Sequence, residues 1–251
     1  MQNVTIYSDL DESVGVLKNI SEMLQIDKIN ISDFEKESLV FDVNSLRFVN
    51  ERKDIDKPKK GVTFDWRSQI QYHKRRNYSL RKEPLAKALG LKGDSVTHVW
   101  DATCGTGKDS LLIHSFGAKV TAFERVPTVA CLILQEVIQN TEALDGRFKF
   151  HFGTMVDVFE NGSIELPDVI YFDPMFPEEG RKKSALPRKE MQIFKTLVGA
   201  DEDSGDFLDW AVSQRVKRVV VKRHPGSPFI KENPTASFES KSVRYDMYSL
   251  I

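Results

Sequence analysis

The 251 residues are enough to bury a full hydrophobic core, and the length suits one large domain with a smaller appendage. A hydrophobic fraction of 40% and a charged fraction of 29% are ordinary for a globular protein and argue against long disorder. No apolar stretch approaches the roughly 20 residues that a membrane helix needs. The acidic N-terminus lacks the layout of a signal peptide, and two cysteines cannot build a zinc site or a disulfide framework. We therefore expect a cytoplasmic protein with no membrane or metal partner, and we expect a monomer.

Residues 1–56 are predicted to form a small α+β domain. Val4–Tyr7 is typical of a short strand, and Glu12–Leu24 carries apolar residues at a helical spacing. The apolar runs Leu39–Val43 and Leu46–Val49 flank an Asn-Ser pair, which predicts a β-hairpin. The lysine- and proline-containing segment Asp54–Gly61 is typical of a linker, so we place a domain boundary there.

Residues 57–95 are predicted to form a basic connecting segment. The chain has a formal net charge of −1, but this segment is strongly basic while the first fifty or so residues lean acidic. We predict a strand at Val62–Trp66, a basic stretch at Arg67–Lys82 and a short helix near Glu83–Leu89. The uneven charge indicates either a polyanionic partner for this segment or a solvated charged face.

Residues 96–251 are predicted to form the main domain, in which strands alternate with helices. The predicted strands are Val96–Trp100, Lys119–Phe123, Phe148–Phe152, Val169–Phe172, Arg218–Val221 and Val243–Tyr248. The predicted helices are Asp109–Phe116, Val126–Leu144, Lys189–Leu197 and Phe207–Gln214. This alternation favours an α/β fold with a mostly parallel sheet and helices on both of its faces.

A glycine-containing turn joins the first strand of this domain to its helix. Gly105 and Gly107 allow positive φ angles and a close approach of the backbone to a ligand. A phosphate-binding P-loop would need a glycine at Ala102, and a dinucleotide fingerprint would need a third glycine at Ser110. Asp101 at the strand end would also repel a pyrophosphate. The turn therefore favours a ligand with a positive or zwitterionic group.

An acidic residue, Glu124, ends the next strand, about 20 residues after the turn. A carboxylate there can bind both hydroxyls of a ribose, although an acidic residue at a strand end is more often only solvated. In combination, Asp101, the glycine turn and Glu124 resemble the S-adenosylmethionine pocket of class I methyltransferases. That resemblance implies a Rossmann-like sheet of seven strands.

The sequence Asp173-Pro174-Met175-Phe176 directly follows the apolar run Val169–Phe172. At the carboxyl end of a buried strand, it stands where open α/β sheets bind ligands. The Asp173 carboxylate can accept hydrogen bonds from an amino group, and Phe176 offers a face on which a planar base can stack. An Asp-Pro pair after a strand is more often a plain turn. Amino-directed methyltransferases resemble this motif, but they carry a second proline where this chain has Met175.

Five segments of the chain resemble one methyltransferase family closely. In order, they are DATCGTGKDS, FERVPTVACLI, YFDPMFP, KKSALPRKEMQIFKTLVGAD and RVVVKR. Their order and spacing are similar to those of the bacterial ribosomal RNA small subunit methyltransferase J family over residues 60–251, and the N-terminal part fits more loosely. The resemblance implies an enzyme that uses S-adenosylmethionine to methylate the N2 amine of a guanine near the 3′ end of 16S rRNA. Its partner would be the rRNA or the small ribosomal subunit.

The resemblance also implies roles for individual residues. Asp173, Pro174 and Phe176 would be catalytic, because they would hold the amine and stack on the base. Cofactor contacts would come from Asp101, Gly105, Lys108, Asp109, Glu124, Arg125, Gly153, Thr154 and Asp173. At Gly153-Thr154 the family pattern leads us to expect a pair of serines, so this chain departs from it there.

Two basic segments are candidates for holding RNA. The first lies among tyrosines that can stack on unpaired bases, but an exposed basic loop with tyrosines packed below it explains the pattern equally well. The second directly follows the Asp-Pro motif, and we expect it in a loop over the pocket. The candidate residues are Lys74, Arg75 and Arg76 in the first segment and Arg181, Lys182 and Lys183 in the second.

The remaining polar candidates favour structural roles. We expect His98, His114 and His151 to be packed or capped within helices and strands. Cys104 lies inside the glycine turn, but no neighbouring residue in the sequence suggests a base that would activate it.

Other functions stay open on the residues alone. The chain could transfer methyl groups to an amine in DNA, in another RNA or in a protein amide. It could also be a non-catalytic RNA-binding protein that kept a methyltransferase scaffold.

Overall fold

The structure is a computed structural model that describes residues 3–7, 28–30, 38–42, 45–49, 51–57, 59–162, 164–174, 204–214 and 216–249. The chain forms two compact units. The first comprises Met1–Asp65, Arg125–Asn140 and Glu178–Gly199, and the second comprises Trp66–Glu124, Thr141–Pro177 and Ala200–Ile251. The predicted division of the chain at residues 56 and 95 stays a prediction. Within the described residues, no helix is both long and apolar enough to cross a membrane.

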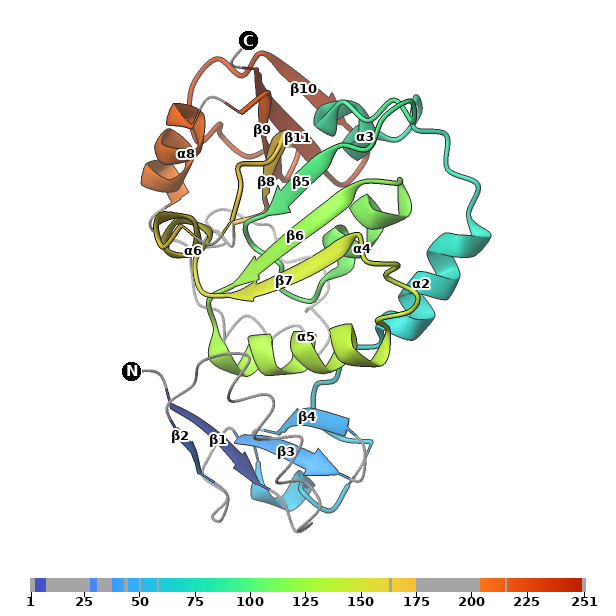
Figure 1. Ribbon diagram of the computed structural model, residues 1–251, viewed down its shortest axis with the longest axis vertical. Helices are drawn as coiled ribbons and strands as arrows, with labels where there is room; N and C mark the ends of the chain where they lie inside the picture. Colours follow the sequence, from blue (N-terminus) through green and yellow to red (C-terminus); the bar gives the residue numbers. More distant parts are fainter. Residues whose placement is uncertain are drawn as a thin grey trace. The chain divides into compact units, whose positions relative to one another are not determined.

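The first unit contains a small sheet with the strand order β2-β1-β3-β4 (Figure 1). Its strands are β1 (Asn3–Tyr7), β2 (Lys28–Asn30), β3 (Ser38–Asp42) and β4 (Ser45–Val49). β1 runs parallel to β2 and to β3, while β3 and β4 form the predicted antiparallel hairpin. The predicted helix Glu12–Leu24 lies outside the described residues.

Helix α5 (Pro127–Gln139) packs against β1 and β4 of this small sheet. The side chain of Gln135 accepts a hydrogen bond from the backbone N–H of Leu46 on β4. The sequence predicts a helix as far as Leu144, but α5 ends at Gln139. The reason is Asn140, whose side-chain amide donates to the carbonyl of Glu136 at 2.8 Å while its backbone leaves helical geometry.

The segment predicted as a linker is fastened to β4 by one buried guanidinium. Arg47 is 1% exposed. It donates hydrogen bonds to the backbone carbonyls of Asp54 at 3.1 Å, Lys60 at 3.0 Å and Ile55. A short 3-10 helix, η1 (Arg52–Asp54), begins this segment. Charge-assisted hydrogen bonds from one side chain therefore make the segment a packed turn of the first unit.

The second unit is built on a seven-stranded sheet with the strand order β10-β11-β9-β8-β5-β6-β7 (Figure 1). The strands are β5 (His98–Asp101), β6 (Lys119–Glu124), β7 (Phe148–Phe152), β8 (Val169–Phe172), β9 (Arg218–Arg223), β10 (Ala236–Glu239) and β11 (Arg244–Ser249). Strands β7, β6, β5, β8 and β9 are parallel, β11 is antiparallel to β9, and β10 is antiparallel to β11. The predicted fold class is confirmed. The sequence did not predict β10, a four-residue edge strand of alternately half-buried and exposed residues.

Helices cover both faces of the large sheet. Trp100 of β5 faces a core that includes Met155 and Leu208 from two of the helices. Successive residues of a strand point to opposite faces, so Asp101 faces the other side, where Ser110 of another helix donates to it. The helices of this unit are α2 (Trp66–Arg75), α3 (Pro84–Leu89), α4 (Lys108–Ser115), α6 (Met155–Glu160) and α8 (Ser204–Ser213).

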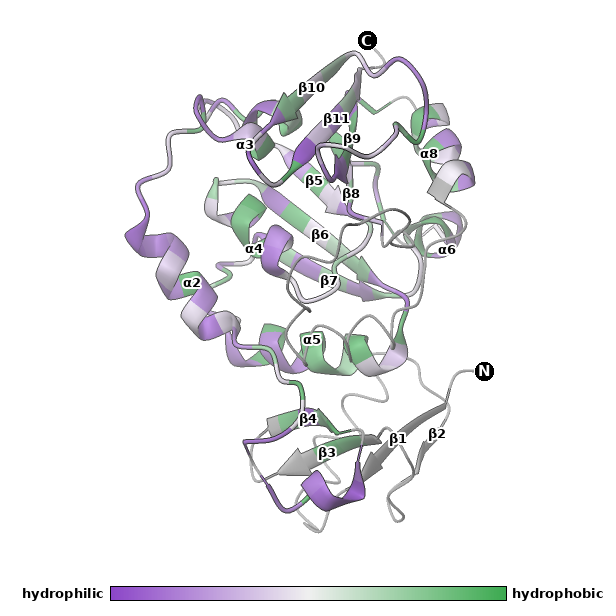
Figure 2. Cartoon of the chain, turned by 180° about the vertical axis from the view of Figure 1, so that it is seen from behind, coloured by the Kyte–Doolittle hydropathy of each residue, from purple (hydrophilic) through white to green (hydrophobic). Residues whose placement is uncertain are grey.

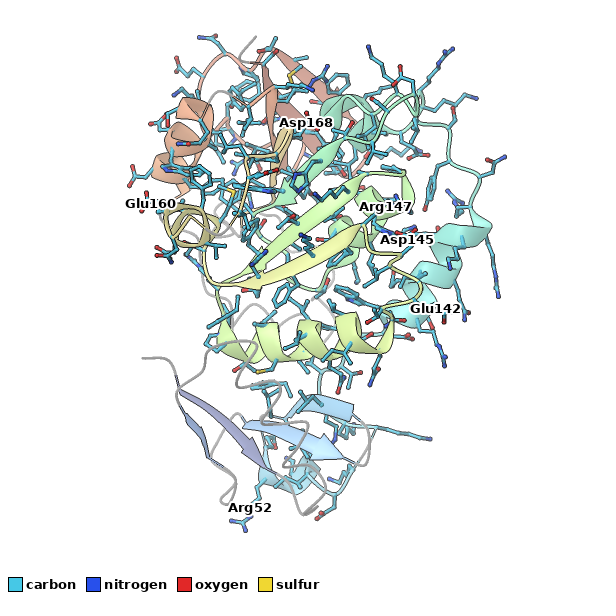
Figure 3. All side chains as sticks on the ribbon, viewed as in Figure 1. Arg52, Glu142, Asp145, Arg147, Glu160 and Asp168 are labelled. Atoms are coloured by element: carbon cyan, nitrogen blue, oxygen red, sulfur yellow. The ribbon has the colours of Figure 1, made fainter. Side chains whose placement is uncertain are left out.

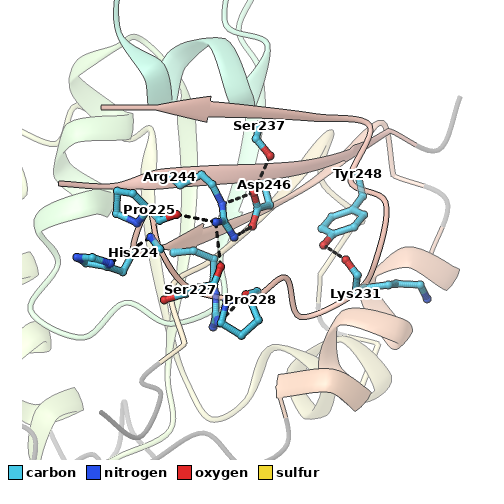
Figure 4. A network of polar contacts seen from close by, with 11 residues as sticks. His224, Pro225, Ser227, Pro228, Lys231, Ser237, Arg244, Asp246 and Tyr248 are labelled. Carbon is cyan, nitrogen blue, oxygen red and sulfur yellow. Dashed lines mark hydrogen bonds and ion pairs between the residues drawn. The ribbon is translucent and has the colours of Figure 1, made fainter. Parts of the chain in front are cut away.

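A buried ion pair orders the loop that follows β9 (Figure 4). Nε and Nη2 of Arg244 each donate to the Asp246 carboxylate at 2.8 Å. Nη1 of Arg244 donates to the backbone carbonyls of Pro225 at 3.0 Å and Ser227 at 2.9 Å. The Arg244 guanidinium, held by Asp246, therefore ties the loop after β9 to β11.

The predicted strand Val62–Trp66 is wrong. Only Val62 pairs, in an isolated bridge with Phe48 of β4, and Trp66 begins helix α2. Trp66 and Ile70 are both buried and lie four residues apart, so they form one helical face that packs toward α4. The indole Nε1 of Trp66 donates to the carbonyl of Thr106 at 3.0 Å, which places the ring against the glycine turn.

Position 107 requires glycine for two reasons: its backbone conformation and the nearby ring of Trp66. Its φ is +79°, and a Cβ atom there would lie 2.2 Å from Cζ2 of Trp66. Gly146 has a similar φ of +74°, but a Cβ there would meet no atom within 4 Å. Substituting Gly146 therefore tests backbone strain alone, whereas substituting Gly107 tests strain together with steric overlap.

We predict that Gly107→Ala destabilises the protein more than Gly146→Ala does. Both variants carry the cost of a left-handed alanine, about 1–2 kcal/mol, and Gly107→Ala adds overpacking of roughly 1–3 kcal/mol. Urea unfolding of the two variants and the parent chain measures the difference. Equal losses in the two variants would show that the ring of Trp66 does not constrain the turn.

Candidate active site

The candidate site lies at the carboxyl edge of the large sheet. Asp101 ends β5, Glu124 ends β6, Asp173 directly follows β8, and Lys222 lies next to the end of β9. Because these strands are parallel neighbours, their carboxyl ends meet at one edge, where open α/β sheets bind ligands.

Asp101 is a fully buried carboxyl group. Its exposed fraction is 0%. It accepts hydrogen bonds from the hydroxyl of Ser110 at 2.5 Å and from the backbone N–H of Thr103 at 3.2 Å. Burial raises the pKa of Asp101 to about 7, against the lowering effect of these two hydrogen bonds. The Asp101 carboxyl group therefore titrates near neutral pH.

The glycine turn is attached to the neighbouring strands by backbone hydrogen bonds. The N–H of Ala102 donates to the carbonyl of Tyr171 at 3.0 Å, and that of Cys104 donates to Phe123 at 2.9 Å. The N–H of Gly105 donates to Oε2 of Glu124 at 3.0 Å. Glu124 is only 5% exposed, so its carboxylate is held in place beside the turn.

The start of the Asp-Pro motif is joined to the same turn. The backbone N–H of Asp173 donates to the hydroxyl of Thr103 at 2.8 Å, and Pro174 is buried. No sequence pattern pointed to Thr103 as a site residue. The predicted site residues Phe176, Arg181, Lys182 and Lys183, as well as Met175, lie outside the described residues.

A lysine that was not among the predicted site residues joins two that were. Nζ of Lys222 lies 2.7 Å from Oδ2 of Asp109 and 2.8 Å from Oδ2 of Asp173. The hydroxyl of Tyr171 also donates to Oδ2 of Asp109 at 2.5 Å. Burial acts to lower the pKa of Lys222, but the two carboxylates outweigh it and raise that pKa. Lys222 is therefore a cation throughout the physiological pH range.

The other predicted cofactor residues differ in their surroundings. Lys108 is exposed at the first turn of α4. Thr154 caps α6, because its hydroxyl oxygen accepts the N–H of Asp157 at 3.1 Å. Gly153 has a φ of +117° and donates its N–H to the carbonyl of Glu124 at 2.9 Å. Arg125 is half-buried and belongs to the first unit.

The predicted RNA-binding residues Lys74, Arg75 and Arg76 lie at the end of α2, and all are exposed. α2 is coloured mostly hydrophilic in Figure 2. The guanidinium of Arg76 lies 5.7 Å from the ring centres of both Tyr72 and Tyr78. Trp66, which touches the glycine turn, is at the other end of this ten-residue helix, about 15 Å away at 1.5 Å per residue. The structure therefore does not bring these cations to the turn itself.

The three histidines with predicted structural roles, His98, His114 and His151, and also Cys104 lie in packed positions, as predicted. Nε2 of His114 contacts the carbonyl of Leu144 at 3.0 Å and the carboxylate of Asp145, which also pairs with Arg147 (Figure 3). Burial raises the pKa of the Cys104 thiol well above its usual value, which keeps it protonated.

The arrangement suits a particular ligand chemistry. Carboxylates from β5, β6, α4 and the end of β8 lie around the glycine turn, whose backbone can approach a ligand closely. Such surroundings favour a ligand with positive charge and hydroxyl groups. Among the described residues, no group of three or more His, Cys, Asp or Glu side chains is arranged to hold a metal ion.

Known proteins with this sequence pattern are methyltransferases. Residues 23–250 match the family described as "Putative SAM-dependent methyltransferase". The chain is 41% identical to a ribosomal RNA small subunit methyltransferase J of Pseudoalteromonas atlantica, over 78% of this chain and 80% of that protein. It is 38% identical to the protein of the same name from Aeromonas salmonicida, over 88% and 89% of the two chains.

A solved structure agrees with these sequence matches. The crystal structure of a SAM-dependent methyltransferase from Neisseria gonorrhoeae superimposes with a TM-score of 0.70 at 25% identity, covering 98% of this chain and 96% of that one. The chain therefore belongs to the ribosomal RNA small subunit methyltransferase J family of S-adenosylmethionine-dependent methyltransferases.

Proposed function

We propose that this protein transfers a methyl group from S-adenosylmethionine to the exocyclic N2 amine of a guanine in 16S rRNA. The names of its relatives support rRNA of the small subunit as the substrate. The observation that carries the choice of an amine is Asp173, whose carboxylate follows β8 and whose backbone is bonded to the glycine turn through Thr103. We further propose that it acts in the cytoplasm as a monomer; its relatives' names, which specify ribosomal RNA, support the location.

The residues at the turn fit the cofactor. S-adenosylmethionine, when bound, supplies an electrophilic methyl group on a positively charged sulfonium. Glu124 stands where a carboxylate can hold a ribose diol, and Gly105 lets the backbone of the turn approach a ligand closely. Glu124 and the Asp109 carboxylate provide negative charge beside that turn, while the buried Asp101 holds the turn through the N–H of Thr103. In this proposal Lys108, Arg125, Gly153, Thr154 and Asp173 complete the cofactor contacts.

Asp173 and Pro174 would prepare the amine for attack. The N2 amine of guanine is a poor nucleophile because its lone pair is delocalised into the ring. If the Asp173 carboxylate and the Pro174 carbonyl accept its two hydrogens, the nitrogen becomes more pyramidal and its lone pair more available. Phe176 would stack on the base. Such a site works mainly by positioning and electrostatic matching, and it requires the guanine to leave its stack.

RNA contacts would come from the two basic segments. Lys74, Arg75 and Arg76 are exposed at the end of α2, and Arg181, Lys182 and Lys183 follow the Asp-Pro motif. Basic side chains neutralise phosphates without reading sequence. They would hold the rRNA while the motif selects the amine.

The proposed substrate is tested by identifying the product. Purified protein is incubated with labelled cofactor and with small ribosomal subunits, naked 16S rRNA or DNA, followed by nucleoside mass analysis. We expect N2-methylguanosine in the reaction with small ribosomal subunits or in that with naked 16S rRNA. A different methylated nucleoside or methylated DNA would favour another amine substrate. Cofactor binding without methyl transfer to any acceptor would favour an RNA-binding protein on this scaffold.

We predict that Asp173→Ala lowers kcat by about 10²–10³-fold, the usual effect of losing one preorganised polar group at a reaction centre. The thermal unfolding midpoint should change little, because the backbone bond to Thr103 remains and Lys222 keeps its ion pair with Asp109. Asp94→Ala, an exposed aspartate before β5, is the matched control and should keep full activity. A fully active Asp173→Ala enzyme would exclude the proposed role.

We predict that Glu124→Gln weakens cofactor binding about 10–100-fold, because a hydrogen bond to a charged group contributes roughly 1.5–3 kcal/mol. Isothermal titration calorimetry with S-adenosylmethionine measures the change. Glu165→Gln, at an exposed position before β8, should bind the cofactor like the parent chain. An unchanged affinity in Glu124→Gln would remove this residue from the cofactor site.

A further inference from the structure

Lys222 holds two carboxylates that come from different parts of the chain. Asp109 lies in the first turn of α4, on the cofactor side of the glycine turn, and Asp173 opens the Asp-Pro motif. Their Oδ2 atoms both lie within 2.8 Å of the same ammonium nitrogen. The three side chains are 23–38% exposed. Their charges are therefore only partly screened by solvent.

The strand register explains why Lys222 reaches Asp173. β8 and β9 are parallel, and Phe172 pairs with Val221. The next residues along the two strands, Asp173 and Lys222, are therefore level with each other. Paired residues of parallel neighbours point to the same face, so the contact follows from the backbone of the sheet.

We propose that Lys222 is a positioning residue that keeps the Asp173 carboxylate ionised and aimed, by sharing one ammonium between Asp173 and Asp109. This inference rests on the proposed function, in which Asp173 must accept hydrogen bonds from the substrate amine. A carboxylate has about four lone-pair positions on its two oxygens. It can therefore accept from Lys222 and from an amine at the same time.

The surroundings make this cation important for the charge of Asp173. Besides Asp109, the titratable groups that face the pair are Asp101 on β5, Tyr171 on β8 and Tyr245 on β11. Burial raises the pKa of both tyrosine hydroxyls, so they stay neutral. Without Lys222, Asp173 and Asp109 would be neighbouring like charges, and one of two such carboxylates holds its proton to higher pH.

Lys222→Met tests the proposal, because methionine keeps most of the length of the lysine side chain and removes its charge. We expect the pKa of Asp173, followed by ¹³C NMR of labelled aspartate carboxyls, to rise by at least about one unit. The acidic limb of the kcat/KM–pH profile, which reports the free enzyme, should move to higher pH by a similar amount. Lys222→Arg should restore both values nearly to those of the parent chain, because it restores the cation.

A second lysine provides the matched control. Lys217 precedes β9 and pairs with Asp168 at 2.7 Å, at the opposite edge of the sheet; Figure 3 labels Asp168. Lys217→Met removes an ion pair of the same kind and should leave the Asp173 titration and the pH profile unchanged. Equal shifts in both variants would indicate a general loss of structure and would overturn the proposal.

A double variant distinguishes the loss of the Lys222 charge from misfolding of Lys222→Met. Asp109→Asn combined with Lys222→Met removes both charges, so the pKa of Asp173 should fall back toward that of the parent chain. A raised value in the double variant, or an unshifted value in Lys222→Met, would overturn the proposal. The NMR titration needs no substrate, so a parent enzyme that fails to methylate rRNA would contradict the proposed function and leave this result intact.

Discussion

The site depends on the backbone of residues 102–107, which is hydrogen-bonded to two neighbouring strands at once. Ala102 donates to the carbonyl of Tyr171 on β8, and Cys104 donates to that of Phe123 on β6. On its other side the turn is covered by the ring of Trp66. These bonds join the ends of β5, β6 and β8 through the sheet, so the positions of Asp101, Glu124 and Asp173 relative to one another are set by its backbone.

Charge is the second constraint on this edge of the sheet. Several carboxylates gathered in a partly buried place repel one another unless each is compensated. The structure compensates these carboxylates in three ways. Asp101 keeps a proton to about pH 7, Asp109 and Asp173 share Lys222, and Glu124 accepts a backbone N–H. The edge that results has the charge that the proposed cofactor and the proposed amine-holding role of Asp173 require.

Local patterns predicted most of the fold, because each depends on residues close together in the chain. The alternation of strands and helices, the hairpin at β3 and β4, and the carboxylates at strand ends are signals of this kind. One error came where a distant partner decides the structure. Trp66 was assigned to a strand because apolar and polar residues alternate from Val62 to Trp66, but it contacts the turn 40 residues later and begins α2.

By itself the sequence determined the order of the strands along the chain, the glycine turn and the acidic residues at the strand ends. Motif resemblance then assigned the family. Only the tertiary structure decided which of these residues meet. Lys222 is 113 residues from Asp109 and 49 from Asp173, and no spacing rule spans such separations. Their contact arises because β8 and β9 are neighbours in one register, a property of the folded sheet and not of any single segment.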